Sequence, residues 1–285
     1  MRRLRLYLPH LRLPFQLTLA PIFLWGALLS GGQWGWGTIA AFLSLHVFLY
    51  PAATAFNSTY DKDEGPVGGL ETPPPVPDGL LRFSVALGAA GVLLALPAGP
   101  AFTVLYALAA GWTAAYSHPA TRWKAGPLSS ALTIALGQGA IGFAAGWAAA
   151  GPLDVADPLL LAGAASAALT AVGLYPVTQV FQIEEDRARG DRTLAVTLGA
   201  AGALRLGAGL LLAGGGLAAW AAGRRLDLWA AAAVALGYLL LVIAQLRLSA
   251  RIGRPYLYRR AMRLVNGATA AFLLFLLFEA LQPAA

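Results

Sequence analysis

Residues 226–247 read LDLWAAAAVALGYLLLVIAQLR, and Asp227 and Arg247 are the only charged residues in this run. The hydrocarbon core of a bilayer is about 30 Å thick, so a helix needs roughly 20 consecutive apolar residues to cross it. The run has this length and is continuously apolar, whereas a strand of a membrane barrel would alternate apolar and polar residues. The sequence therefore predicts a transmembrane helix here.

Runs of the same kind recur along the chain. Of 285 residues, 58% are hydrophobic and 12% charged, whereas an ordinary soluble domain carries about 25% charged residues. We expect an all-α, polytopic membrane protein whose residues 1–285 form one transmembrane domain. The first run follows a basic N-terminus, as in a signal peptide, but its length and the later runs favour an uncleaved helix. The predicted crossings, about nine, lie near residues 13–32, 36–58, 80–99, 101–117, 128–150, 158–183, 194–222, 226–247 and 261–281.

The basic residues test this helix count, because Lys and Arg accumulate in cytoplasmic loops. Under the predicted layout, all of the 20 Lys and Arg residues except Arg224 and Arg225 lie on one side. We therefore expect a cytoplasmic (inner) membrane protein with its N-terminus in the cytoplasm and its C-terminus outside. These cations are dispersed over five cytoplasmic segments, so the net charge of +7 does not indicate a nucleic-acid partner.

Acidic residues are concentrated in two segments of the same side. Asn57 and Asp61 are four residues apart, so they share one helical face at the end of the second run. Gln182 and Asp186 repeat this spacing at the end of the sixth run. An even number of crossings separates the two helix ends, which returns the second cluster to the membrane face of the first. The acidic residues of the two segments are Asp61, Asp63, Glu64, Glu71 and Asp78, then Glu184, Glu185, Asp186 and Asp191.

These carboxylates would repel one another unless cations lie between them. Without cysteine, the chain offers oxygen ligands, which suit hard cations. Mg²⁺ typically takes one or two carboxylates and completes its shell with water and substrate phosphate, so Mg²⁺ with a phosphorylated substrate would relieve the repulsion. The alternative is that the clusters are solvated helix ends. Asp191, which precedes Thr193 and the next run, is expected to cap a helix instead.

Polar and aromatic residues extend both faces into the membrane. Above Asn57, at helical spacing, stand Thr54, Tyr50 and His46, and above Gln182 stand Tyr175, Thr178 and Gln179. Such side chains usually face a bundle interior or a cavity, although they also join helices. We expect them to line a cavity; for His46 taken alone, a contact between helices is the favoured interpretation.

Basic residues near the clusters offer partners for phosphate. Arg122 and Lys124, in the loop after the fourth run, can hold diphosphate oxygens or simply anchor the loop at the interface. We assign Lys62 to the same diphosphate. For the arginines from Arg247 to Arg263, attraction to anionic membrane lipid is favoured over substrate binding.

Two segments carry a resemblance to a known family. NSTYDKDEG at residues 57–65 resembles the first aspartate-rich motif of the UbiA superfamily of intramembrane prenyltransferases, N-D-x-x-D-x-x-x-D. QIEED at residues 182–186, with Gly190 and Thr193 downstream, is similar to its second motif, D-x-x-x-D. Helix count and motif positions match as well. Ser58, Gly65 and Gln182 stand where the family has Asp, which leaves the number of metal ions open.

The resemblance implies a UbiA-like bundle around a central cavity that opens sideways to lipid. It implies Mg²⁺-dependent transfer of a prenyl group from a polyprenyl diphosphate to an aromatic or other lipophilic acceptor. By carry-over, Asn57, Asp61 and Asp186 are the catalytic metal ligands. Tyr116, Arg122 and Lys124 resemble the phosphate-side loop. Further ligands by a shifted register are Asp63, Glu64, Gln182 and Glu185.

Two other functions remain open. A membrane terpene cyclase would use the same ionisation of the diphosphate without an external acceptor. A cation-coupled transporter or non-catalytic membrane binder would use the carboxylates as an ion site, but transporters tend to place such sites near the bilayer midplane, in broken helices.

Overall fold

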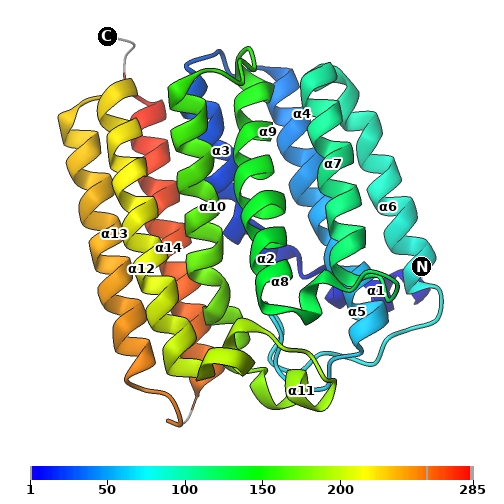
Figure 1. The fold of residues 1–285 in the computed structure, drawn as a ribbon. Coiled ribbons are helices and arrows are strands. Elements are labelled where there is room, and N and C mark those ends of the chain that lie inside the picture. Colours follow the sequence, from blue (N-terminus) through cyan, green and yellow to red (C-terminus); the bar gives the residue numbers. More distant parts are fainter. Residues whose placement is uncertain (1, 255, 283–285) are drawn as a thin grey trace.

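The computed structural model describes residues 2–254 and 256–282, and their regular secondary structure is helical apart from one β-bridge between Val67 and Leu70 (Figure 1). The expected all-α architecture is confirmed. The α-helices are α1 (Arg2–Leu11), α2 (Leu13–Gln16), α3 (Ala20–Ser30), α4 (Trp36–Leu43), α5 (Tyr50–Asp61), α6 (Leu80–Ala95), α7 (Pro100–Ser117), α8 (Pro127–Thr133), α9 (Ile141–Ala150), α10 (Pro158–Gln179), α11 (Ile183–Ala188), α12 (Leu194–Arg225), α13 (Leu228–Ser249) and α14 (Leu257–Ala280).

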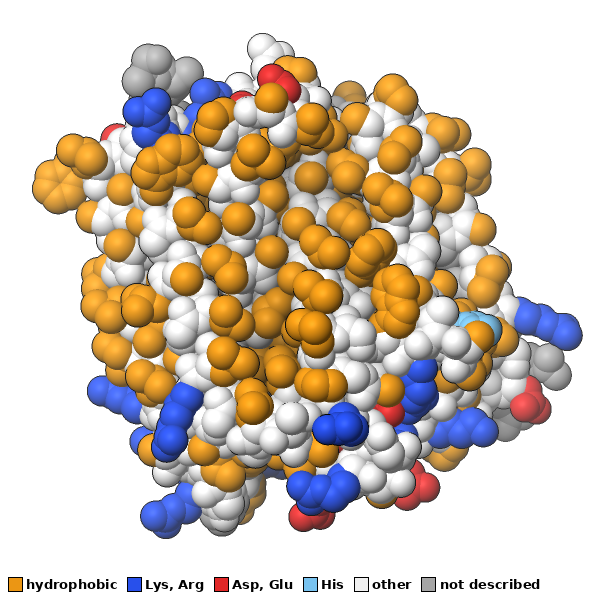
Figure 2. All heavy atoms as spheres, viewed as in Figure 1, with side chains coloured by type: hydrophobic (Ala, Val, Ile, Leu, Met, Phe, Trp, Pro, Cys, Tyr) orange, Lys and Arg blue, Asp and Glu red, His pale blue; other side chains and the backbone are white. Residues whose placement is uncertain are grey.

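Eight helical stretches of the described chain are long and apolar enough to cross a membrane. The helix α7 runs alongside them (Figure 1) and has 18 residues, but it is not among the eight. Apolar side chains cover most of the height of the face in Figure 2, and Lys and Arg gather mainly at its lower edge. These features make the chain an integral, multi-pass membrane protein. The side chains of Arg2 and Arg3 and the predicted position of the C-terminus, at residues 283–285, lie outside the described part.

The N-terminal segment differs from its predicted form. The helix α1 precedes the expected first crossing and crosses the lower end of the bundle (Figure 1). Arg12 has a positive φ of 47°, which ends the helical path before α2 begins. Because α1 exposes Leu4, Leu6 and Leu8 while its other face packs on α5, its pattern fits a helix lying in the membrane interface.

Close helix contacts hold the bundle together where α3 meets α9. A Cβ atom on Gly26 would lie 2.0 Å from the carbonyl oxygen of Phe143, and one on Gly146 would lie 1.8 Å from that of Phe23. Neither site has room for a methyl group. Small residues let membrane helices approach until their backbones touch, which replaces the hydrophobic drive that lipid cannot supply.

A buried amide joins three further helices. The Nε2 atom of Gln245 on α13 donates to the carbonyl oxygens of Gly173 on α10, at 2.9 Å, and Leu204 on α12, at 3.0 Å. Gln245 is fully buried. This side chain therefore ties the outer helix α13 to the rest of the bundle at the lower end.

The substitution Gly146→Ala is expected to destabilise the fold, because the added methyl group forces α3 and α9 apart. Overpacking of this kind costs about 1–3 kcal/mol. The matched control is Gly216→Ala on α12, where a Cβ meets nothing within 4 Å. Thermal unfolding in detergent measures both. Equal melting temperatures for the two variants would contradict the proposed contact.

Candidate active site

A cavity of about 910 Å³ lies inside the bundle. Its polar end is lined by Asp61, Asp63 and Asp186, and its walls are largely apolar, with Trp25, Phe272 and Phe275 among them. Pockets for small molecules commonly have about 300–1,000 Å³. The space therefore accommodates a sizeable organic ligand with one charged end.

The cavity reaches the surface that faces lipid. Leu236 and Leu240 of α13 line it, although each is 57% exposed. Gly267 and Ala271 of α14 also line it and are exposed. The opening therefore lies between the outer helices α13 and α14, within the apolar height of the bundle.

The two acidic segments converge at the polar end, as the sequence predicted. Asn57 and Asp61 occupy the last turns of α5, and the chain then turns at Lys62, whose φ is 51°, to bring Asp63 to the cavity. The guanidinium of Arg189 bridges the segments, with 2.7 Å from Nη1 to Asp63 Oδ1 and 2.7 Å from Nη2 to Asp186 Oδ1. Residues that are more than 120 positions apart in the chain therefore share one site.

Four cations of the chain pair with five carboxylates at this end, because Arg189 also contacts Glu185 at 3.4 Å. Lys124 donates to Asn57 Oδ1 at 2.9 Å and pairs with Asp61. Arg122 binds both oxygens of Asp191, at 3.1 and 3.0 Å. The remaining cations are Arg189, described above, and Arg12, whose Nη2 lies 3.8 Å from Asp63 Oδ2. The sequence predicted cations between these carboxylates, and side chains of the chain itself supply part of that positive charge.

Burial shifts the pKa of the charged groups outside the spanning helices. It raises the pKa of the Asp63 carboxyl, and Asp61 raises it further, whereas Arg189 lowers it. Burial also raises the pKa of Asp186, against the hydrogen bond from Arg189. It lowers the pKa of the Lys124 ammonium, which Asp61 opposes. Burial thus disfavours every charged form, and the ion pairs offset this cost.

Two local predictions about the second segment were wrong. The helix α10 ends at Gln179, and Gln182 stands at the N-terminus of the separate short helix α11, although it still lines the cavity. Asp191 does not cap α12, because its carboxylate is turned to Arg122. The cap is Thr193, whose hydroxyl accepts from Val196 N at 3.4 Å and donates to Asp186 Oδ2 at 3.2 Å.

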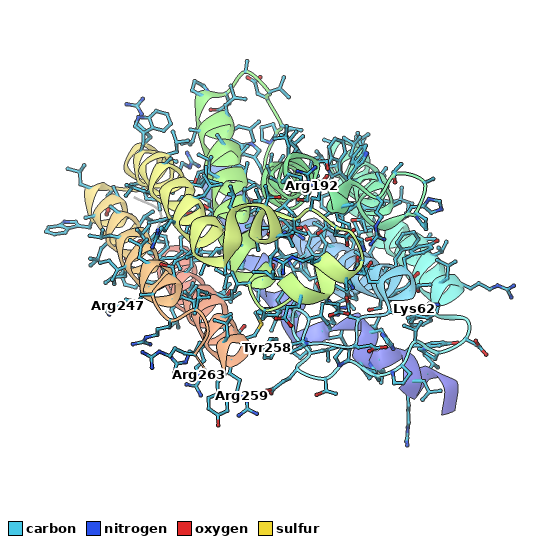
Figure 3. All side chains as sticks on the ribbon, turned by 60° about the horizontal axis from the view of Figure 1, so that its bottom comes forward. Lys62, Arg192, Arg247, Tyr258, Arg259 and Arg263 are labelled. Carbon is cyan, nitrogen blue, oxygen red and sulfur yellow. The ribbon has the colours of Figure 1, made fainter. Side chains whose placement is uncertain are left out.

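Five predicted site residues do not line the cavity, and one of them is Arg122, which is bound to Asp191. Lys62 is exposed at the end of α5, apart from the arginines labelled in Figure 3. Glu64 and Glu185 contact each other instead, through a 3.0 Å bond from Glu64 N to Glu185 Oε1. His46 is buried in the π-helical segment Ser44–Leu49 and bonds Phe42 O at 3.0 Å. Its ring packs against Tyr50, at 5.1 Å between ring centroids, and against Phe23 of α3, at 5.9 Å, so His46 joins helices, as favoured for this residue taken alone.

The predicted wall residues other than His46 line the cavity. Tyr116 and Tyr175 share a hydrogen bond of 2.7 Å between their hydroxyls. Gln16, which the sequence did not single out, donates to Thr54 at 3.2 Å. The predicted wall residues that line the cavity are Tyr50, Thr54, Tyr175, Thr178 and Gln179, and Tyr116 and Lys124, predicted to bind diphosphate, line it too.

Sequence reasoning also missed Arg12 and Arg189. Arg189 had a local signal, because it follows Asp186 by three residues and so shares its helical side. Arg12 had none, since it donates at 3.1 Å to Ser58, which is 46 residues away. Arg12, Lys62 and Arg122 all have positive φ values, and such strain in residues other than glycine tends to gather at functional sites.

The oxygen atoms at the polar end fit Mg²⁺ that is shared with a substrate. Asp63 Oδ2 is buried without a hydrogen-bond partner. No three His, Asp or Glu side chains of the described residues gather closely enough to hold a metal ion by themselves. Mg²⁺ suits such a sparse set, because it needs only one or two carboxylates when phosphate oxygens and water complete its shell.

Comparison with known proteins adds a sequence relative and several similar folds. A 2-acylphloroglucinol 4-prenyltransferase from Humulus lupulus is 32% identical over 136 residues, which cover 47% of the chain and 33% of that relative. The match thus spans about a third of the relative's length. A UbiA homologue from Archaeoglobus fulgidus, solved with GPP and Mg²⁺, has a TM-score of 0.74 at 19% identity, covering 96% of this chain and 98% of the other. The apo UbiA homologue from Aeropyrum pernix K1 has a TM-score of 0.67 at 20% identity, covering 94% and 98%.

The structural likeness establishes the fold, and the match to a family profile identifies the family from the sequence. The profile described as the UbiA prenyltransferase family matches residues 19–278, which include both acidic segments and every helix from α3 to α13. The chain belongs to the UbiA prenyltransferase family.

Proposed function

We propose that this chain transfers a prenyl group from an allylic prenyl diphosphate to a lipophilic acceptor within the membrane, with Mg²⁺ as cofactor. One observation carries the proposal. Acidic and basic side chains from α5, α11 and the loops between helices converge at one end of an apolar cavity that opens toward lipid. A prenyl diphosphate has the same division, with a charged head and an apolar tail.

The polar end would hold the diphosphate head. Asn57, Asp61, Asp63, Gln182 and Asp186 are the residues that would hold Mg²⁺, which supplies positive charge against the departing diphosphate. Lys124 and Arg189 would bind diphosphate oxygens directly, as compact and forked donors respectively. Their present carboxylate partners show that both side chains already reach the site.

The cavity walls would protect the reacting carbon of the prenyl group from water. As the bond between the allylic carbon and the diphosphate oxygen breaks, positive charge develops on the prenyl group. The paired hydroxyls of Tyr116 and Tyr175 place oxygen dipoles near the polar end, and the apolar walls exclude water that would otherwise capture the cation. The acceptor then forms the new bond and loses a proton. The named activity of the hop relative motivates phenolic acceptors as the first class to test.

We further propose that the site faces the cytoplasm of a cell's inner membrane. This orientation is supported by the distribution of basic residues, which places Arg224 and Arg225 alone on the opposite side. Donor and Mg²⁺ would then enter from the cytoplasm.

Asp61→Asn and Asp186→Asn are each expected to lower the rate of diphosphate release from geranyl diphosphate by roughly a hundredfold or more. Removing one group that stabilises the charge developing in a transition state typically lowers the rate by about this factor. Purified protein with Mg²⁺ and a panel of phenolic acceptors provides the assay. The matched control is Glu184→Gln, also on α11 but exposed and outside the cavity, which should keep the wild-type rate. Full activity in both Asn variants, in folded protein, would contradict the proposal.

Mg²⁺ and the diphosphate should bind cooperatively. The carboxylates are already paired with cations of the chain, so Mg²⁺ alone meets little excess negative charge until the diphosphate arrives. We expect geranyl S-thiolodiphosphate, a slowly reacting analogue, to raise the affinity for Mg²⁺ roughly tenfold or more, within the usual range of coupling energies. Isothermal titration with and without the analogue measures this. Equal Mg²⁺ affinity in the two titrations would refute it.

The orientation can be tested with single cysteines, because the chain has none of its own. Val155→Cys, in the exposed loop between α9 and α10, should react with an impermeant maleimide in intact spheroplasts. Ala250→Cys, at the end of α13, should react only after the membrane is permeabilised. The reverse labelling pattern would overturn the assignment.

A further inference from the structure

A second, smaller pocket of about 180 Å³ lies where α13 ends and α14 begins. Its rim carries Arg247, Arg251 and Arg260, and its remaining lining is Ala244, Leu248 and Leu264. Figure 3 shows Arg247 at the end of α13 on the same side of the bundle as Arg259 and Arg263 of α14. The pocket thus combines three arginine side chains with an apolar floor of three residues.

The three arginines have no acidic partner in the part of the chain that the structure describes. Within residues 247–263, the ion pair formed there is that of Arg259 with Glu71, at 3.0 Å. Arg260 also stands in the first turn of α14, where the helix dipole adds positive potential. Cations that only mark topology need no common pocket, so their place around one pocket fits an anionic ligand.

The pocket also adjoins the main cavity. Ala244 and Leu264 line both spaces. Leu240 and Leu236 lie one and two turns above Ala244 on α13, and both are exposed beside the opening between α13 and α14. A molecule with its anionic group on the arginines would therefore lay an apolar tail along this face.

We propose that the pocket binds the phosphate headgroup of an anionic phospholipid, with one acyl chain along α13 beside the cavity opening. The guanidinium fork matches phosphate oxygens, and the apolar floor matches the first carbons of the lipid. An inorganic anion would use the arginines but not the floor or the leucine face. This inference does not depend on the proposed transferase activity.

Native mass spectrometry of the full chain in nonionic detergent tests the site, with dioleoylphosphatidylglycerol and dioleoylphosphatidylcholine as probes. We expect the wild type to bind the anionic lipid preferentially. The triple variant R247Q/R251Q/R260Q should weaken that binding on the order of a hundredfold, given the usual attraction between an interfacial cation and an anionic lipid. The variant R247K/R251K/R260K should retain most of it.

The matched control is R82Q/R205Q/R254Q, which removes three exposed arginines that do not line the pocket and should keep the wild-type preference. Equal loss in the control would overturn the site, because net charge alone would then explain binding. Equal affinity for the two lipids would overturn it as well. Displacement of the lipid by equimolar inorganic phosphate or geranyl diphosphate would assign the pocket to that ligand instead.

Discussion

The arrangement of the site depends on balancing charge in a place where water is scarce. Carboxylates at the ends of α5 and α11 stand over an apolar cavity, where an unpaired charge is expensive. Arg189 offsets that cost by joining Asp63 to Asp186, and Lys124 does the same between Asn57 and Asp61. These ion pairs position the loop after α5 and the short helix α11 against each other, so the site is already assembled when ligands arrive.

Hydropathy alone predicts most of the fold. Continuous apolar runs of the length of a bilayer admit one local structure, because every backbone polar group must be satisfied inside the segment. The N-terminal helix α1 was not predicted, because its arginines resemble the basic start that precedes a first transmembrane helix. Its exposed leucines indicate an interfacial helix only once its buried face is known. The end of α10 was placed too late because Val180 and Phe181 are as apolar as the helix before them.

The site was predictable where its residues share a local pattern and not where they meet from afar. The spacing of Asn57 and Asp61 predicts a common face, and the structure has it. The residue types around His46 do not indicate that its ring packs against Phe23 and Tyr50, which keeps the side chain out of the cavity. Arg12 pairs with Ser58 and Asp63 of another segment, and no residue close to Arg12 in the sequence predicts this pairing. Thr193 and Asp191 are both plausible caps, and only the position of Arg122 decides between them.

The open side of the cavity between α13 and α14 bears on how a donor would be selected. An enclosed tunnel acts as a ruler, because a longer isoprenoid strikes its closed end. Here the cavity has a lateral opening instead of a closed end, bordered by Leu236, Gly237 and Gly267. A tail that outgrows the chamber can continue among the acyl chains outside. The site would then select a donor by its diphosphate and its first isoprene units. The length of the rest of the chain would be set by the enzyme that synthesises the donor.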